Sequence, residues 1–235
     1  MTPDQEALPL VVDELDVLAA LVPLAAREIV ELGCGAAQLS RALLERHPDS
    51  RVTALEVDVR QHAKNIAAPQ QGLHFVLGGA EAIAFPDASF DLALMLKSLH
   101  HVPLALLAQA LAEAARVLRP GGHLYVSEPV YAGTFNEVIR LFNDEGTVRA
   151  AAQAALDTAL RSGVWEQVAE RRFGMPVRFS DFADFEQRMM RPTYADHRLD
   201  DAKLAEVRAA FEPHCGPDGA RFTRPMHARL LRRHG

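Results

Sequence analysis

The sequence predicts an α/β fold with a mostly parallel sheet and helices on both of its faces. Short apolar runs alternate with segments of helical periodicity from residue 27 to residue 130. Glycines follow the first apolar run, and Pro120-Gly121-Gly122 ends a helical segment. The chain has 235 residues, 49% of them hydrophobic, which is enough for one domain with a sizeable core.

Five strands and three helices are expected in this first part of the chain. The strands are expected at residues 28–32, 51–57, 73–77, 90–96 and 123–128, and the helices at 39–43, 59–68 and 104–118. Strands that alternate with helices pair in parallel and are joined by right-handed crossovers. The expected fold is therefore α/β, Rossmann-like and doubly wound.

The pattern changes after the fifth strand, where two helical segments follow each other with no strand between them. The elements expected there are helices at 136–145 and 148–173, a sixth strand at 185–195, a helix at 199–212 and a closing strand at 226–233. This completes a mostly parallel seven-stranded sheet with a helical cap insertion after strand five. We interpret the chain as a single domain, 1–235, with a core at 27–130, a cap at 131–181 and C-terminal elements at 182–235.

The composition excludes several classes of protein. The net charge of -6 argues against a nucleic-acid partner, and the two cysteines, Cys34 and Cys215, form no CxxC pair. The ten histidines have no metal-ligand spacing, so no metal is expected. The N-terminus has no basic-then-apolar leader pattern, and no apolar run is long enough for a membrane span. A cytoplasmic protein is expected.

Two local patterns have structural interpretations. Residues 220–235 contain five arginines and no acid, which is typical of a charged edge strand, although a nucleic-acid contact is the alternative. Four phenylalanines are expected to form a core rather than to line a substrate pocket: Phe173, Phe179, Phe182 and Phe185.

The turn after the first strand has the features of a ligand site. Gly33 and Gly35 follow the strand, and Gln38 stands where the GxGxxG pattern of dinucleotide-binding proteins has its third glycine. Glu31 precedes the turn and Glu56 ends the second strand. A carboxylate beside the turn does not suit a pyrophosphate but suits an ammonium group, and Glu56 can accept ribose hydroxyls. S-adenosylmethionine, a nucleoside with a cationic amino-acid tail, fits; a dehydrogenase is the weaker alternative.

The chain resembles the class I S-adenosylmethionine-dependent methyltransferases over residues 29–130. The segments that carry the resemblance are "VELGCG", "VTALEVD", "GGAEAIAFPDASFDLALMLKSLHHV" and "ARVLRPGGHLYVSEP", in this order and spacing. Within that class, the chain looks most like small-molecule enzymes of the ubiquinone and menaquinone methyltransferase type. The resemblance implies S-adenosyl-L-methionine as cofactor and S-adenosyl-L-homocysteine as product.

The resemblance also implies a set of cofactor-binding residues. Glu31, Gly33 and Gly35 would line the methionine moiety, Glu56 would bind the ribose with Val57 against adenine, Ala80 and Glu81 would lie beside the adenine, and Leu96 and Lys97 would border the sulfonium. Two positions depart from the family pattern. Ala37 stands where a third glycine is frequent, and Gly79 where an Asp often accepts from the adenine amino group. Glu81 or a backbone carbonyl would replace that Asp.

Candidate catalytic residues follow strands four and five. A general base is needed only where the acceptor must lose a proton early, as an alcohol or phenol must. His100, His101 and Glu128 are the candidates, since each falls near a strand end in the expected cleft. The alternatives are packing, helix capping or solvation for the histidines, and an ion pair with a cap arginine for Glu128.

The predicted function is methyl transfer to a small-molecule acceptor by in-line displacement. The alternatives are an RNA- or protein-directed methyltransferase and a non-catalytic S-adenosylmethionine-binding module. The sequence leaves the acceptor open, and it allows either a monomer or a homodimer.

Overall fold

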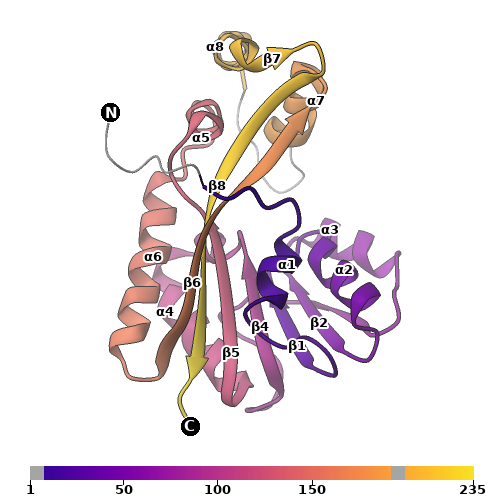
Figure 1. The fold of residues 1–235 in the computed structure, drawn as a ribbon, viewed down its shortest axis with the longest axis vertical. Helices are drawn as coiled ribbons and strands as arrows, with labels where there is room; N and C mark the ends of the chain where they lie inside the picture. Colours follow the sequence, from indigo (N-terminus) through magenta and orange to yellow (C-terminus); the bar gives the residue numbers. More distant parts are fainter. Residues whose placement is uncertain (1–7, 192–198) are drawn as a thin grey trace. The chain divides into compact units, whose positions relative to one another are not determined.

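The computed structural model describes residues 8–191 and 199–235, which contain one mixed sheet and its helices (Figure 1). The strand order is β3-β2-β1-β4-β5-β8-β6, and the short β7 pairs with β8. The strands are β1 (Glu28–Leu32), β2 (Arg51–Glu56), β3 (Leu73–Leu77), β4 (Phe90–Leu96), β5 (Leu118–Pro129), β6 (Trp165–Phe179), β7 (Cys215–Gly216) and β8 (Gly219–Arg233). The helices are α1 (Glu14–Ala19), α2 (Gln38–Arg46), α3 (Val59–Ile66), α4 (Leu107–Val117), α5 (Thr134–Ile139), α6 (Gly146–Arg161), α7 (Phe182–Phe185) and α8 (Asp201–Phe211).

The chain divides into two compact units. We call the first the sheet unit; it comprises Asp13–Glu128, Val148–Arg171 and His227–Gly235. We call the second the aromatic unit; its described residues are 8–12, 129–147, 172–191 and 199–226. The strands β6 and β8 each contribute residues to both units.

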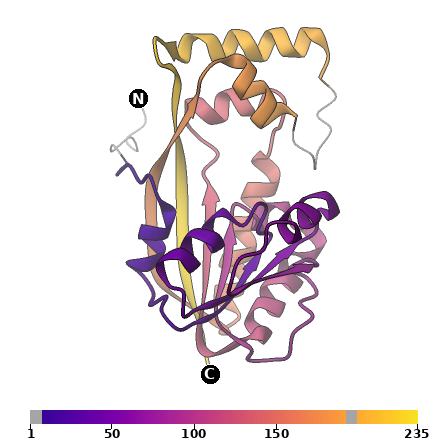
Figure 2. The ribbon, with the colours of Figure 1, turned by 90° about the vertical axis from the view of Figure 1, so that its right-hand side faces the viewer.

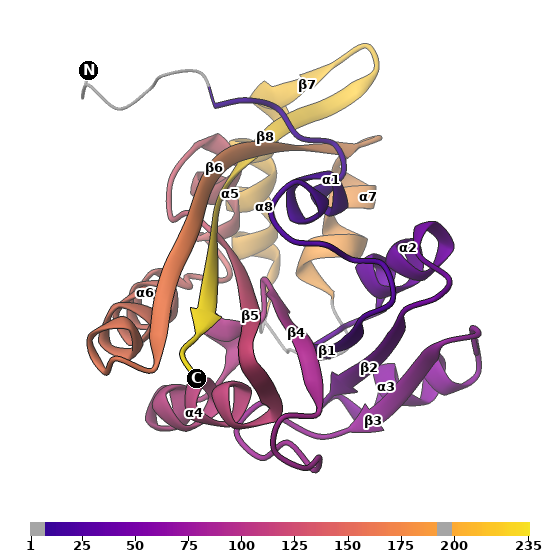
Figure 3. The same cartoon turned by 60° about the horizontal axis from the view of Figure 1, so that its bottom comes forward.

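The sheet unit has the predicted α/β architecture. The pairs β1–β2, β1–β4, β2–β3 and β4–β5 are all parallel. Helices α2 and α3 lie against one face of the sheet, and α4 and α6 against the other (Figure 2 and Figure 3). The main core lies on the α4 and α6 side, where residues of β1, β4 and β5 pack against Leu111 and Leu156. Near-continuous burial of β1 and β4 explains why these strands were predictable from their apolar runs.

The aromatic unit has a core of phenylalanines. The rings of Phe179 and Phe185 are 5.1 Å apart, and those of Phe185 and Phe211 are 4.8 Å apart. Arg188 and Arg208 lie over the rings of Phe179 and Phe182 at 4.6 and 4.2 Å. All four phenylalanines predicted to form a core, including Phe173, are buried.

The prediction of helix over residues 162–173 is wrong, because these residues belong largely to β6. Gly163, with φ 77°, follows the end of α6, which is the usual position of a helix-terminating glycine. From Trp165 to Glu170, burial alternates between successive residues, with Trp165 inside and Glu166 exposed. This two-residue period is that of a strand.

The sixth strand predicted at residues 185–195 is also wrong over its described part. Asp181 caps α7 by accepting a hydrogen bond from the Asp184 backbone N–H at 2.9 Å, and a π-helical turn continues over Glu186–Met190. Phe182 and Phe185 therefore meet on one helix face, next to the phenylalanine core. Residues 192–195 lie outside the described part of the chain.

The interpretation of the arginine-rich segment as an edge strand is wrong as well. It belongs to β8, which lies between β5 and β6. Arg229, only 7% exposed, is accommodated there because its guanidinium pairs with Asp157 at 2.8 Å and donates to Gln167 at 2.6 Å. The closing strand is longer than expected, since it begins at Gly219. Helix α1 had no counterpart in the prediction.

No helix in the described ranges combines the length and the apolar character needed to cross a bilayer.

Candidate functional site

The carboxyl ends of β1, β2, β4 and β5 bring most of the predicted site residues to one edge of the sheet. Glu31 pairs in register with Ala54 of β2 and with Leu94 of β4. Beyond the end of β4, the backbone N–H of Lys97 donates to the carbonyl of Ser127 on β5 at 2.7 Å. In open α/β sheets, ligands bind at this edge.

Both glycines of the turn after β1 have a left-handed backbone conformation. Gly33 has φ 76° and Gly35 has φ 53°, in the left-handed region that favours glycine. A Cβ added at Gly33 would lie 2.8 Å from the Cβ of Ser98, so the turn is in close contact with the loop after β4. Ala37, with φ 54°, adopts the same left-handed conformation at the N-cap of α2, which explains why glycine would suit this position. Burial raises the pKa of the Cys34 thiol well above its usual range, which argues against a nucleophilic role.

Glu31 is a buried carboxylate beside this turn. It is 4% exposed and accepts a short hydrogen bond from the Ser40 hydroxyl of α2. Burial raises the pKa of Glu31 from 4.5 to about 7, while the hydrogen bond from Ser40 and the charge of Lys97 oppose the shift. A cationic group bound beside Glu31 would favour its ionised form.

Glu56 is held rigidly at the end of β2. One carboxylate oxygen accepts from the Gly35 backbone N–H at 2.7 Å, and the other accepts from the Asp58 backbone N–H at 2.9 Å. Asn65, a buried residue of α3, donates to the Gly35 carbonyl at 2.8 Å. Both backbone polar groups of Gly35 are thus bonded to side chains. Val57 is 64% exposed beside Glu56.

The loop between β3 and β4 contains the residues predicted to contact adenine. Ala80 is buried, and the Glu81 side chain folds back over Gly79. A Cβ added at Gly79 would collide with the Glu81 carboxylate, so this carboxylate occupies the space that a side chain at position 79 would need.

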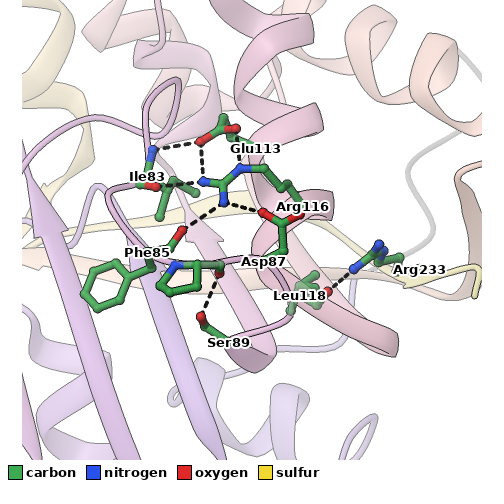
Figure 4. Close-up of polar contacts among 9 residues, drawn as sticks. Ile83, Phe85, Asp87, Ser89, Glu113, Arg116, Leu118 and Arg233 are labelled. Atoms are coloured by element: carbon green, nitrogen blue, oxygen red, sulfur yellow. Dashed lines mark hydrogen bonds and ion pairs between the residues drawn. The ribbon is translucent and has the colours of Figure 1, made fainter.

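Side chains of helix α4 bind the backbone of the loop between β3 and β4. Gln109 donates to the Glu81 carbonyl at 2.8 Å, and Glu113 accepts from the Ile83 backbone N–H at 3.0 Å. Figure 4 shows the Arg116 guanidinium bonded to Glu113 and Asp87 and to two loop carbonyls, those of Ile83 and Phe85, each at 2.8 Å. The hydrogen bond from Arg116 lowers the pKa of Glu113.

A second polar cluster lies beyond the end of β4. Lys97, with φ 55°, forms an ion pair with Glu14 of α1, with 3.1 Å between Nζ and Oε2. Glu14 is 4% exposed and also accepts from the Tyr125 hydroxyl at 3.3 Å. Desolvation raises the pKa of Tyr125 well above its usual range. The Ser98 hydroxyl donates to the Leu32 carbonyl at 2.7 Å and so fixes the loop against β1.

His100 and Glu128 form a buried pair at the ends of β4 and β5. The Nδ1 of His100 is in hydrogen-bond contact with Glu128 Oε2, and Glu128 Oε1 accepts from the Leu99 backbone N–H at 2.9 Å. The two rings of His100 and His101 are 4.1 Å apart. Two of the three candidate catalytic residues are therefore in direct contact.

The structure also identifies residues that sequence reasoning missed. Glu14, Asn65 and Tyr125 reach this edge from α1, α3 and β5, and Gln109, Glu113 and Arg116 fix the loop from α4. The spacing of the α4 residues, at i, i+4 and i+7, places them on one helix face and was the available signal. Glu14 and Tyr125 lie 111 positions apart, and no local pattern predicts that they are in contact.

Comparisons with known proteins agree with this geometry. A family model described as a methyltransferase domain matches residues 30–126. The phthiotriol/phenolphthiotriol dimycocerosates methyltransferase of Mycobacterium leprae is 39% identical over 116 residues, 45% of this chain and 39% of that protein. The ubiquinone/menaquinone biosynthesis C-methyltransferase of Dinoroseobacter shibae is 33% identical over 117 residues, 46% of this chain and 44% of that protein. These matches span less than half the length of either relative.

Solved structures share the fold over nearly the whole chain. The YcgJ protein from Bacillus subtilis has a TM-score of 0.67 at 15% identity and covers 94% of this chain and 98% of its own. A methyltransferase structure from Bacillus halodurans has a TM-score of 0.66 at 16% identity and covers 95% of this chain and 99% of its own. Residues 30–126 are thus similar in sequence to methyltransferase domains, and the solved structures share the fold of the chain.

Proposed function

We propose that the chain transfers a methyl group from S-adenosylmethionine to a small-molecule acceptor. The observation that carries the proposal is the pair of buried carboxylates, Glu31 and Glu56, on either side of a left-handed glycine turn. Such a site suits a ligand with an ammonium group and ribose hydroxyls, and it disfavours a pyrophosphate. The methyltransferase model matched at residues 30–126 supports the same ligand.

The proposal assigns a part of the cofactor to each predicted residue. Glu31, Gly33 and Gly35 hold the methionine moiety, and Glu56 holds the ribose, with Val57 beside adenine. Ala80 and Glu81 flank the adenine, and Leu96 and Lys97 border the sulfonium. The fixed orientation of the Glu56 carboxylate supports its role, because each of its oxygens retains a second lone pair for a ribose hydroxyl.

Glu81 is the proposed acceptor for the adenine amino group. The family often has an Asp where Gly79 stands, and the Glu81 carboxylate occupies the space of a side chain at that position. The three α4 side chains that bind the loop backbone keep this carboxylate in place.

When bound, S-adenosylmethionine supplies an already activated methyl group on sulfur. The residues of this chain then have to orient the reacting atoms and exclude water. The ion pair of Lys97 with Glu14 supports this arrangement, because it balances a positive charge that would otherwise face the sulfonium.

A small molecule is the proposed acceptor. Relatives that match the same part of the chain are named for phthiotriol dimycocerosates, for ubiquinone and menaquinone biosynthesis, and for 27-O-demethylrifamycin SV. The last of these, from Amycolatopsis mediterranei, is 33% identical over 119 residues. The net charge of -6 supports a small molecule over RNA. A cytoplasmic location and a monomeric or homodimeric state remain predictions.

Calorimetric titration with S-adenosylhomocysteine, after removal of any copurified nucleoside, tests the cofactor. We expect micromolar binding by the wild type and loss of most binding in Glu56→Ala. Glu28→Ala is the matched control, because Glu28 lies at the opposite end of β1 and pairs with Arg51 at the surface. Stabilisation by NADH, with no response to either S-adenosyl compound, would contradict the proposal.

A further inference from the structure

The buried pair at the ends of β4 and β5 points to the class of acceptor. Building on the proposed function, we propose that His100 is the general base of the reaction, that Glu128 is its positioning residue, and that the acceptor is a hydroxyl group of an alcohol or a phenol.

Contacts on both oxygens fix the Glu128 carboxylate. Oε1 accepts from the Leu99 backbone N–H at 2.9 Å, and Oε2 contacts Nδ1 of His100. Glu128 is 2% exposed, and a buried polar group of this kind is retained only where its hydrogen bonds are satisfied. The carboxylate therefore has one orientation, and it imposes one orientation on the His100 ring.

The contact with Glu128 also selects the tautomer of His100. The Glu128 carboxylate already accepts a hydrogen bond from the Leu99 backbone N–H, so it acts as an acceptor in this cluster. An ionised carboxylate can only accept, so the proton of the neutral imidazole resides on Nδ1. The basic nitrogen is then Nε2, on the side of the ring away from Glu128. An acid that orients a histidine through Nδ1 is a recurrent arrangement for a general base.

A short stretch of chain connects the pair of His100 and Glu128 to the glycine turn after β1. Ser98, two residues before His100, lies against Gly33 and donates to the Leu32 carbonyl at 2.7 Å. The His101 ring lies beside the His100 ring, tilted by 42° with 4.1 Å between the centroids, which further limits rotation of the His100 ring. The base is thus held on the loop that borders the glycine turn.

This arrangement suits a hydroxyl acceptor. The hydroxyl oxygen forms a bond to the methyl carbon, and the carbon–sulfur bond breaks with its electron pair remaining on sulfur. The hydroxyl proton passes to Nε2 of His100 and then to solvent, so charge and atoms balance without another reactant. A neutral amine already has a lone pair for the attack and loses its proton afterwards, so it does not require a base so placed.

Histidine ¹⁵N NMR of the S-adenosylhomocysteine complex tests the pair without an acceptor. We expect the Nδ1–H tautomer at His100 in the wild type and its loss in Glu128→Gln. The Nε2–H tautomer in the wild type would overturn the assignment. Because the complex must form for this measurement, failure to bind the product contradicts the proposed function, and a wrong tautomer contradicts only this inference.

Methylation of defined probes tests the acceptor class. With S-[methyl-¹³C]adenosylmethionine, we expect labelled methoxy groups on 4-methylphenol and 4-nitrophenol and none on benzylamine nitrogen. In His100→Ala, the rate with 4-methylphenol should fall by about 10²–10⁴, while the more acidic 4-nitrophenol should lose far less because it ionises without help. Added imidazole should restore part of the lost rate.

The methylation experiment has a control variant and defined outcomes that would contradict the inference. His74→Ala removes an exposed histidine of β3 and should leave both rates unchanged. Label on nitrogen or ring carbon alone would overturn the inference. So would equal losses with both phenols, or no methoxy product from an enzyme that binds S-adenosylhomocysteine.

Discussion

The sheet unit and the aromatic unit bury very different side chains. The sheet unit buries ionisable groups, among them Glu31, Glu56, His100 and Glu128, at or beyond the ends of its parallel strands. In the described part of the aromatic unit, Asn136 is the one buried polar residue, and the core consists mainly of phenylalanines. Burying charge costs stability unless the charge is compensated, so we expect the reaction to take place in the sheet unit, where the buried ionisable groups lie.

The largest expected effect comes from the aromatic core. Phe185→Ala removes a fully buried ring and should lower the free energy of unfolding by about 3–5 kcal/mol. Urea denaturation measures this loss, and Val12→Ala, at a residue 83% exposed, is the control with little effect. S-adenosylhomocysteine affinity should persist in Phe185→Ala under conditions where the sheet unit remains folded; parallel loss of both would mean that the two units do not differ as described.

The next effect concerns the pH dependence of the sheet unit. Burial raises the pKa of Glu31 from 4.5 to about 7, so between these values the folded chain holds a proton that the unfolded chain releases. The free energy of unfolding should therefore decrease as the pH rises through this window, by about 3 kcal/mol in total. Glu31→Gln should flatten this part of the profile in denaturation experiments, whereas Glu28→Gln should not. A wild-type profile that rises with pH instead, with the same slope in Glu31→Gln, would show that Glu31 is ionised throughout.

The α4 contacts should have a smaller effect, mainly on the cofactor. Arg116→Met leaves the Ile83 and Phe85 carbonyls without their charged donor, so the loop loses two hydrogen bonds to α4. We expect S-adenosylhomocysteine affinity to fall by about tenfold to a hundredfold, since the loop carries the proposed adenine contacts. Arg119→Met is the control, because Arg119 pairs with Asp91 at the partly exposed opposite end of the sheet. Equal affinities in the two variants would show that the loop needs no such support.

The smallest effect should come from Glu81. Glu81→Ala should weaken S-adenosylhomocysteine binding by about tenfold, corresponding to about 1.4 kcal/mol for one hydrogen bond. Adding Gly79→Asp to this variant should restore affinity, because the removed Glu81 side chain vacates the space at position 79. Gly79→Ala in the same background is the matched control without a carboxylate. Titrations in which the Asp and Ala variants bind alike would exclude the proposed contact.

Sequence periodicity predicted the sheet unit better than the aromatic unit, for a physical reason. Strands β1 to β4 are short runs rich in apolar residues, as is the second half of β5, and the glycine turn has a sharp local pattern. Residues 166–172 of β6 are Glu, Gln, Val, Ala, Glu, Arg and Arg, most of which favour helices, and only the two-residue burial period reveals a strand. Arg229 in β8 is buried because residues 62 and 72 positions away pair with it, which no local pattern contains.

In the candidate site, too, some features follow from a local sequence pattern and others depend on residues distant in sequence. The residues Glu31, Glu56 and Glu128 were predictable, because carboxylates directly after apolar strands must meet at one edge of a parallel sheet. The helix residues that donate hydrogen bonds to Glu31 and to the Gly35 carbonyl were not predictable in the same way. Asn65 and Ser40 lie on helices whose exact rotation depends on packing, and both are ordinary polar residues in sequence.

The hydrogen bonds on both backbone groups of Gly35 have a consequence for the kinetics of ligand binding. Glu56 accepts its N–H and Asn65 donates to its carbonyl, so the turn is already ordered before a ligand arrives. A receptor that needs no ordering step binds in a single phase, and its observed rate increases linearly with ligand concentration. Asn65→Ala should introduce a slow, saturable phase, because the free chain would then populate turn conformations that cannot accept the nucleoside.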